Sequence, residues 1–95
     1  MNLSKISLTN NQHLNQFEME IEDQIALIAY HTIHSDTLAL DHTEVPEQLQ
    51  GKGIASALVE KTFHYLEEHN MKMLPYCPFI RTYLQRHPDW YRLVA

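Results

Sequence analysis

The sequence has little of several residue types, and each shortage narrows what the chain can be. It contains one cysteine, so no disulfide can form within it, and we expect a reducing, cytoplasmic setting. No apolar run approaches the ~18 residues of a transmembrane helix, and residues 1–10 predict no signal peptide. Lys and Arg number seven against twelve acidic residues. The formal charge of -5 therefore argues against binding to nucleic acid or to an anionic membrane.

The chain has 95 residues, of which 44% are hydrophobic, and this predicts one small domain with a modest core. Seven histidines raise the possibility of a metal site, but their spacing does not favour one. His31 and His34 would point to opposite faces of a strand, and His64 and His69 are five apart on a helix, which does not align them. We therefore expect no metal site.

Hydrophobic periodicity predicts a meander of antiparallel strands in the first half of the chain. Ser4 to Leu8 is a candidate short strand, and Leu14 to Glu22 alternates apolar with acidic residues as in a half-buried strand. A turn is expected at Asp23-Gln24. Gln24 to Ile33 is apolar on both faces and predicts a central strand covered on two sides. After a turn at Ser35-Asp36, the last strand of the meander should run from Thr37 to Val45.

Strict alternation along Thr37 to Val45 assigns its side chains to two faces. One face would carry Leu38, Leu40, His42 and Glu44, and the other Ala39, Thr43 and Val45. Two ionisable groups would thus continue an apolar face toward the end of the strand.

The two glycines of the chain, Gly51 and Gly53, follow this strand directly and precede a long amphipathic helix. Glycine allows unusual backbone angles and close approach of a ligand. The first turn of a helix offers unpaired N–H groups and positive potential. Together these features form a candidate phosphate or pyrophosphate site. The alternative is an ordinary strand-to-helix turn, because the G-x-G signal is short.

The second half of the chain predicts a crossover and a second helix. Apolar residues recur at helical spacing for about 18 residues, and Asn70 can end that helix in the left-handed conformation. The helix should deliver a strand, Met71 to Leu74, parallel to the last strand of the meander. A short helix should begin at Pro78. The remainder should pack back on the domain through Trp90, Tyr91, Leu93 and Val94.

Cys77 and His42 are the candidates for chemistry. Cys77 precedes Pro78 at the expected N-cap of the second helix, where the helix dipole stabilises a thiolate. If the two expected parallel strands are neighbours, His42 comes to the same edge and could accept a proton from the thiol or from an amine. Glu44 is an alternative base or could orient His42. The structural alternatives are a small buried thiol, a partly buried histidine and a surface carboxylate.

The order of these motifs resembles the GNAT acetyltransferases. Their acetyl-CoA motif is Gln/Arg-x-x-Gly-x-Gly/Ala, which Gln48, Gly51 and Gly53 match. The chain is more similar still to the compact, stand-alone GNAT-like proteins of this length. That similarity lies in His42 to Val45, Gly51 to Ala55, Pro75 to Phe79 and Arg86 to Pro88. The resemblance covers nearly all of residues 1–95. It implies a single α/β (α+β) domain with a minimal GNAT fold, in which a strand meander precedes a strand-helix-strand parallel unit and a short helix.

The resemblance also implies a cosubstrate, acetyl-CoA, and a set of residues that bind it. The pyrophosphate of coenzyme A would lie on backbone N–H groups of Gln50, Gly51, Lys52, Gly53, Ile54 and Ala55. The pantetheine arm would pair with the backbone of Thr43, Glu44 and Val45, where two parallel strands splay apart. Cys77 and His42 would be the catalytic pair, either through an acetyl-cysteine or by direct transfer with His42 as base. Tyr83 is a further candidate at the position of a general acid, with core packing as its alternative.

The chain departs from larger GNAT enzymes because it lacks the helices and strands that help to build their acceptor site. The acceptor, an amine on a small molecule or a protein, is therefore not specified, and we expect a monomer or a weak homodimer. Two other functions stay open beside N-acetyl transfer. One is a CoA-binding or interaction module with little catalysis, and the other is a Cys/His thioester hydrolase.

Overall fold

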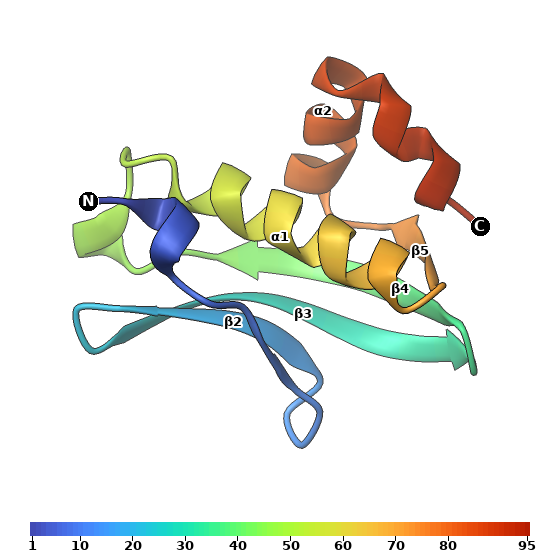
Figure 1. Ribbon diagram of the computed structural model, residues 1–95, viewed down its shortest axis with the longest axis horizontal. Coiled ribbons are helices and arrows are strands. Elements are labelled where there is room, and N and C mark those ends of the chain that lie inside the picture. Colours follow the sequence, from blue (N-terminus) through green and yellow to red (C-terminus); the bar gives the residue numbers. More distant parts are fainter.

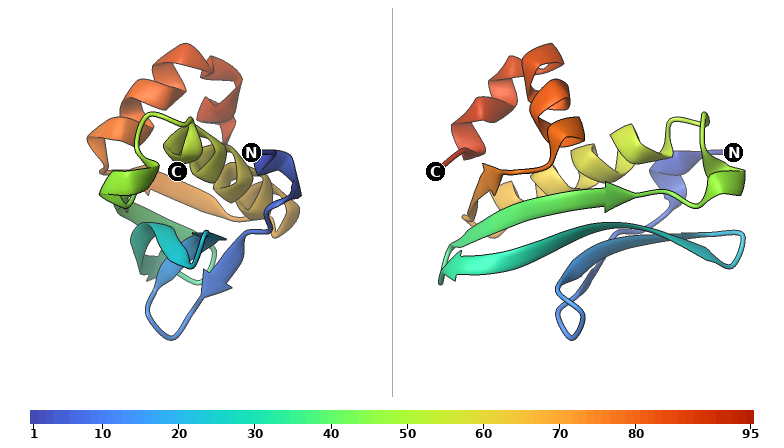
Figure 2. Two further views of the ribbon diagram at one scale, coloured as in Figure 1. Left: turned by 90° about the vertical axis from the view of Figure 1, so that its left-hand side faces the viewer. Right: turned by 180° about the vertical axis from the view of Figure 1, so that it is seen from behind.

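A computed structural model describes residues 1–95 as one five-stranded sheet with every helix on the same side of it (Figure 1, Figure 2). The first four strands form an antiparallel meander, and the fifth pairs in parallel with the fourth. This confirms the predicted α/β class and strand order. The elements are β1 (Thr9–Asn11), β2 (Gln16–Ile21), β3 (Gln24–His34), β4 (Thr37–Glu44), α1 (Ile54–Glu68), β5 (Lys72–Pro75) and α2 (Pro78–Arg86). Short 3-10 helices occupy Leu3–Lys5, Glu47–Leu49 and Pro88–Leu93.

The core lies between the sheet and α1. The apolar residues of β2 are buried, as their alternation predicted, and those of α1 recur at helical spacing against them. Phe17 stacks at a tilt on Tyr30, with ring centroids 5.0 Å apart, and Tyr65 of α1 meets its edge at 5.2 Å. No helix combines the length and the apolar character needed to cross a membrane.

The opposite face of the sheet carries no helix, which corrects the expectation that β3 is covered on two sides. Ala26, Ile28 and Tyr30 are buried toward α1, but Ile25 and Ile33 on the other face are exposed. The crossover α1 and the following α2 both lie on the same side, so nothing in the chain covers the other (Figure 2). We call this uncovered side the open face.

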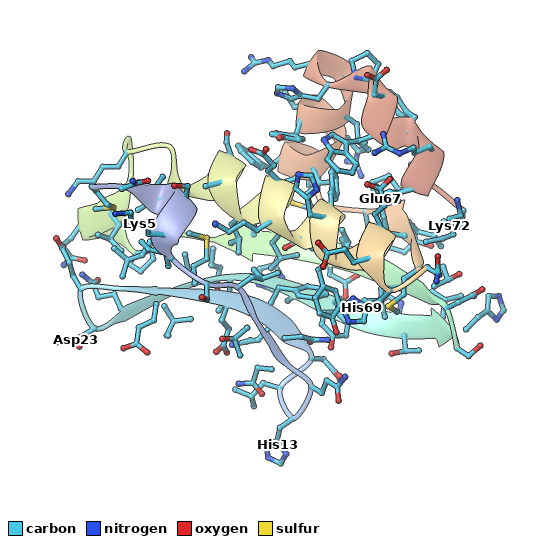
Figure 3. All side chains as sticks on the ribbon, in the orientation of Figure 1. Lys5, His13, Asp23, Glu67, His69 and Lys72 are labelled. Atoms are coloured by element: carbon cyan, nitrogen blue, oxygen red, sulfur yellow. The ribbon has the colours of Figure 1, made fainter.

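The N-terminal segment differs from its prediction. Residues 4–8 do not form a strand, because the Asn2 side chain accepts a hydrogen bond from the Ser4 N–H at 3.1 Å and starts a 3-10 helix instead. The first strand is Thr9–Asn11, where Asn10 accepts a hydrogen bond from the Tyr30 hydroxyl at 2.7 Å. The β2–β3 turn lies at Glu22 and Asp23, one residue earlier than predicted (Figure 3).

The second half follows the prediction closely. Helix α1 has 15 residues, about one turn fewer than expected, and Asn70 beyond it is left-handed with φ 54°. Asn70 thus ends the helix region as predicted. Strand β5 then pairs in parallel with β4, from Thr37 opposite Lys72 to Leu40 opposite Pro75.

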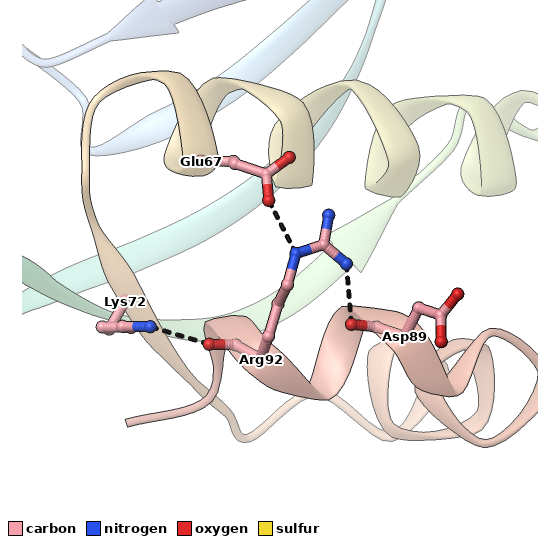
Figure 4. Close-up of polar contacts among 4 residues, drawn as sticks. All are labelled: Glu67, Lys72, Asp89 and Arg92. Atoms are coloured by element: carbon pink, nitrogen blue, oxygen red, sulfur yellow. Dashed lines mark hydrogen bonds and ion pairs between the residues drawn. The ribbon is translucent and has the colours of Figure 1, made fainter.

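Polar contacts hold the C-terminal segment on α1 and β5 (Figure 4). Arg92 Nε donates to Glu67 at 2.7 Å, and this hydrogen bond lowers the pKa of the Glu67 carboxyl. Lys72 Nζ donates to the Arg92 carbonyl at 2.7 Å. Leu93 is buried and Val94 forms a parallel bridge with Met73, as the predicted packing requires. Tyr91 corrects that prediction, because its side chain stays exposed.

One buried group in α1 lacks a partner, and its removal provides a test of the core. The Thr62 hydroxyl is fully buried and accepts or donates no hydrogen bond. A buried unsatisfied hydroxyl costs about 1–3 kcal/mol. We expect Thr62→Val, which keeps the shape, to raise the free energy of unfolding in urea by about 1 kcal/mol. Thr62→Ala is the control, because it removes the same hydroxyl but leaves a cavity. A valine variant less stable than wild type would contradict this account of the core.

Candidate functional site

The site begins at a β-bulge in the middle of β4. Tyr30 of β3 pairs with Leu40, but the preceding Ala29 pairs with His42, so Asp41 has no opposite residue. Each inserted residue exchanges the faces of the strand beyond it. Thr43 therefore pairs with the core residue Ile28 and faces the helices, whereas His42 faces the open side with Ala29.

A gap opens between β4 and β5 at the bulge. Their ladder ends at Leu40 and Pro75, where the Leu40 carbonyl accepts from the N–H groups of Tyr76 and Cys77 at 3.1 and 3.0 Å. Pairing of β4 with β3 continues to Glu44. The last residues of β4 thus have a neighbouring strand on one side only, and their other edge is free to pair with an extended, amide-bearing molecule.

An open cavity of about 400 Å³ adjoins this gap on the helix side. This size lies within the usual range for small-molecule sites. Its walls come from the end of β4, the loop after it, the first turn of α1 and the start of α2. The lining residues are Thr43, Val45, Leu49, Gln50, Gly51, Gly53, Ile54, Ala55, Ser56 and Phe79.

Six consecutive backbone N–H groups, from Gly51 to Ser56, donate to no acceptor within the protein. Both glycines adopt left-handed angles, φ 79° at Gly51 and 78° at Gly53, so the chain turns sharply into α1. The first intrahelical bond of the turn is donated by Ala57 to the Gly53 carbonyl at 3.1 Å. A row of free donors at a helix N-terminus is suited to bind a phosphate group.

The row of free N–H donors begins one residue later than the predicted phosphate site, which included Gln50. The Gln50 N–H already donates to the Glu47 carbonyl at 3.2 Å, so Gln50 cannot offer it to a ligand. Its side-chain amide donates to the Val45 carbonyl at 3.3 Å, which links the loop to β4. Lys52 is exposed and does not line the cavity, although its N–H is among the free donors.

Cys77 occupies the N-cap of α2, as predicted, and is 3% exposed. Its Sγ lies 3.4 Å from Thr43 Oγ1, within hydrogen-bonding distance for sulfur, with either atom able to donate. The thiol therefore sits on the helix side of the gap, directly against a residue that lines the cavity. The gap itself is held at this end by Arg81, whose guanidinium donates to the carbonyls of Pro75 and Tyr76 at 3.1 and 2.6 Å.

The structure does not bring His42 to Cys77. The bulge places His42 and Glu44 on the open face, which corrects the expectation that they share a face with Leu38 and Leu40. His42 Nε2 lies 3.8 Å from Glu44, beyond hydrogen-bonding distance, and its side chain is 57% exposed. A direct contact between the thiol and this imidazole is therefore absent.

Tyr83, the candidate general acid, does not line the cavity. It is buried on α2, with its ring edge-on to Phe63 at 5.8 Å and stacked on His87 at 4.2 Å. Burial raises the pKa of its phenol, and the nearby Glu60 charge raises it further. Its contacts are those of a core residue.

Three further residues line the cavity that were not predicted from the sequence: Leu49, Ser56 and Phe79. Ser56 could have been found, because the third residue of any helix has a free N–H. Phe79 could not, since nothing in the sequence specifies that the start of α2 packs beside the start of α1.

Comparisons with known proteins agree with this fold. A sequence profile of the GCN5-related N-acetyltransferases matches residues 16–94. The chain is 28% identical to the protein NATD1 of Xenopus tropicalis, over 90% of this chain and 80% of that protein. It is 26% identical to NATD1 of Mus musculus, over 87% and 77%. The fold also resembles the NMR structure of a GCN5-like protein from Staphylococcus aureus. Their TM-score is 0.70 and their sequences are 21% identical, over 97% of this chain and 90% of that one.

The left-handed angle at Gly53 leads to a stability test. An added Cβ would meet no atom within 4 Å, so the cost of a substitution is conformational alone. We expect Gly53→Ala to lower the free energy of unfolding by about 1–2 kcal/mol, the cost of placing a side chain in that region. Gly53→Asn is the matched control, because asparagine tolerates these angles and should lose less. Equal losses in urea unfolding would show that the angle is not the cause.

Proposed function

The chain belongs to the GCN5-related N-acetyltransferase family, and from that premise we propose that it binds acetyl-CoA in the cavity beside β4 and transfers the acetyl group to an amine. The observation that carries this proposal is the row of six free N–H donors from Gly51 to Ser56 at the mouth of a gap in the sheet. The row of N–H donors suits a pyrophosphate, and the gap suits an extended arm that carries amide groups.

The proposed binding mode follows the order of these features along the cavity. The pyrophosphate lies on the N–H groups of residues 51–56, with the exposed Lys52 as the nearby cation. The pantetheine arm runs along the free edge of β4 from Val45 toward Thr43, with Phe79 covering it from α2. The thioester then reaches the closed end of the gap, next to Cys77. Backbone donors supply most of the phosphate binding, since the loop has only one basic residue.

The chemical step joins the amine nitrogen to the thioester carbonyl carbon and breaks the carbon–sulfur bond. An alkylammonium acceptor loses two protons, of which one ends on the departing CoA sulfur and one passes to water. Cys77 has two possible roles. It can attack first and carry the acetyl group, or its thiol can donate a proton to the leaving CoA thiolate during direct transfer. Either role suits its position against Thr43 on the helix side of the gap.

His42, the predicted partner of Cys77, is placed to act on the acceptor rather than on the thiol. From the open face it can approach an acceptor in the gap but does not contact the thiol. We therefore propose that Cys77 and His42, if both act, do so on the same thioester from opposite sides of β4.

The uncovered open face favours one alternative, a CoA-binding module with little catalysis. No helix lies over that face to help form an acceptor site (Figure 2). A thioester hydrolase is the other alternative. Adding amines distinguishes the binding module and the hydrolase from an acetyltransferase, because only acetyl transfer releases CoA faster when amines are present.

The free N–H donors can be tested singly with proline. We expect Ala55→Pro to weaken acetyl-CoA binding roughly tenfold in calorimetry, because it removes one hydrogen bond to a charged group. Proline in the first helical turn breaks no intrahelical bond. Ala55→Ser keeps the N–H and should bind like wild type. Wild-type affinity in the proline variant, with unchanged folding, would contradict the proposed pyrophosphate position.

Intact-protein mass spectrometry after incubation with acetyl-CoA tests the role of Cys77. An acetyl-cysteine route predicts a gain of one acetyl group in wild type that is absent in Cys77→Ser and is discharged by amines. Direct transfer predicts no gain, with acetylated amine still formed. CoA release that amines do not accelerate would indicate hydrolysis, and bound CoA without release would indicate the binding module.

A further inference from the structure

The open face carries a second candidate group beside the gap, a hydrogen-bonded pair of His31 and Asp41. His31 Nδ1 lies 2.8 Å from Asp41 Oδ2. A carboxylate accepts, so Nδ1 is the donor, and in the neutral ring Nε2 keeps a free lone pair. The side chains are 52% and 35% exposed, which leaves Nε2 open to a ligand. An imidazole oriented by a carboxylate in this way is the arrangement of a general base.

The β-bulge creates this pair and places it at the closed end of the gap. Asp41 is the inserted residue of β4, and the Leu40 carbonyl before it holds the start of the segment after β5. The first residue of that segment, Tyr76, is half exposed, with its ring 6.3 Å from the His31 ring. The next residue is the buried Cys77. The pair and the thiol therefore flank the same end of the gap, one from each side of the sheet.

His31 is distinguished from the other histidines by its partner. His42 and His64 each lie 3.8 Å from a carboxylate, too far for a hydrogen bond. His69 Nδ1 lies 2.8 Å from the carbonyl of Tyr65 in its own helix, and Figure 3 shows it at the far end of α1. Among the histidines, only His31 has a carboxylate that fixes its tautomer beside the gap.

We propose that the acceptor is an alkylammonium that enters from the open face, and that His31, positioned by Asp41, removes its proton. This rests on the proposed acetyl transfer. Nε2 of His31 takes one proton from the ammonium, which frees the nitrogen lone pair. The nitrogen attacks the thioester carbon and the carbon–sulfur bond breaks. The second proton of the nitrogen passes to the departing thiolate, which is that of CoA in direct transfer and that of Cys77 in the acetyl-cysteine route. His31 returns its proton to water. Asp41 and Glu44 on the same side attract the cation as it approaches.

The test measures CoA release with butylamine as the probe acceptor, from pH 6 to pH 9. General-base removal costs about 10²–10⁴-fold, so we expect His31→Gln to lower kcat/KM at least 100-fold at pH 7. The loss should shrink as pH rises, because free amine then needs no base. Acetyl-CoA affinity, measured by calorimetry, should not change. Asp41→Asn should lose roughly tenfold with the same pH trend, which a merely structural role would not produce.

Two variants serve as comparisons. His64→Gln removes a histidine near a carboxylate on α1 and should keep wild-type activity, whereas His42→Gln tests the competing base on the same face. Wild-type activity in His31→Gln, or a 100-fold loss in His42→Gln alone, would overturn the role of His31 and leave acetyl transfer intact. A wild-type protein that binds acetyl-CoA but never acetylates butylamine, spermidine or lysine amide would overturn both proposals together.

Discussion

The early end of the β4–β5 ladder is the constraint on which the candidate site depends. Parallel pairing stops at Leu40 and Pro75, and one carbonyl, that of Leu40, then accepts two successive N–H groups. Because β5 turns away into α2 there, β4 keeps an unpaired backbone edge while β3 supports it from the other side. The gap, the position of Cys77 on the helix side and the cavity at the start of α1 all follow from this divergence of two strands.

The sequence predicted those parts of the fold that local chemistry decides. Alternation in β2, helical spacing in α1, the left-handed Asn70 and the N-cap at Cys77 each have a cause within a few residues, and each is confirmed. The position of the free N–H donors was also predictable, to within one residue, because two glycines precede a helix there. That they bind a phosphate stays a prediction. The predictions that failed mainly concerned features that tertiary packing decides. The apolar β3 gave no sign that its second face stays uncovered, since composition alone cannot tell how many layers a sheet receives.

The error at His42 has a single physical cause. Alternation along a strand holds only while every residue has a partner, and the bulge at Asp41 breaks that condition. One unpaired residue exchanged the faces of all that follow, so Thr43 rather than His42 came to lie beside Cys77. The same inserted residue brought Asp41 to His31, a pairing that sequence spacing did not indicate. The bulge thus separates His42 from Cys77 and instead brings Asp41 to His31 at the same end of the sheet.

The C-terminal segment lies along β5, and this position affects the tendency of the molecule to self-associate. Unpaired outer strands invite another chain to add to a sheet and so promote aggregation. Here Val94 bridges to Met73, and the Ala95 N–H donates to the Met73 carbonyl at 3.0 Å, which covers that edge. The opposite edge, β1, is only three residues long. These features of β5 and β1 disfavour self-association through the two outer edges of the sheet. The unpaired edge of β4 at the interior gap remains.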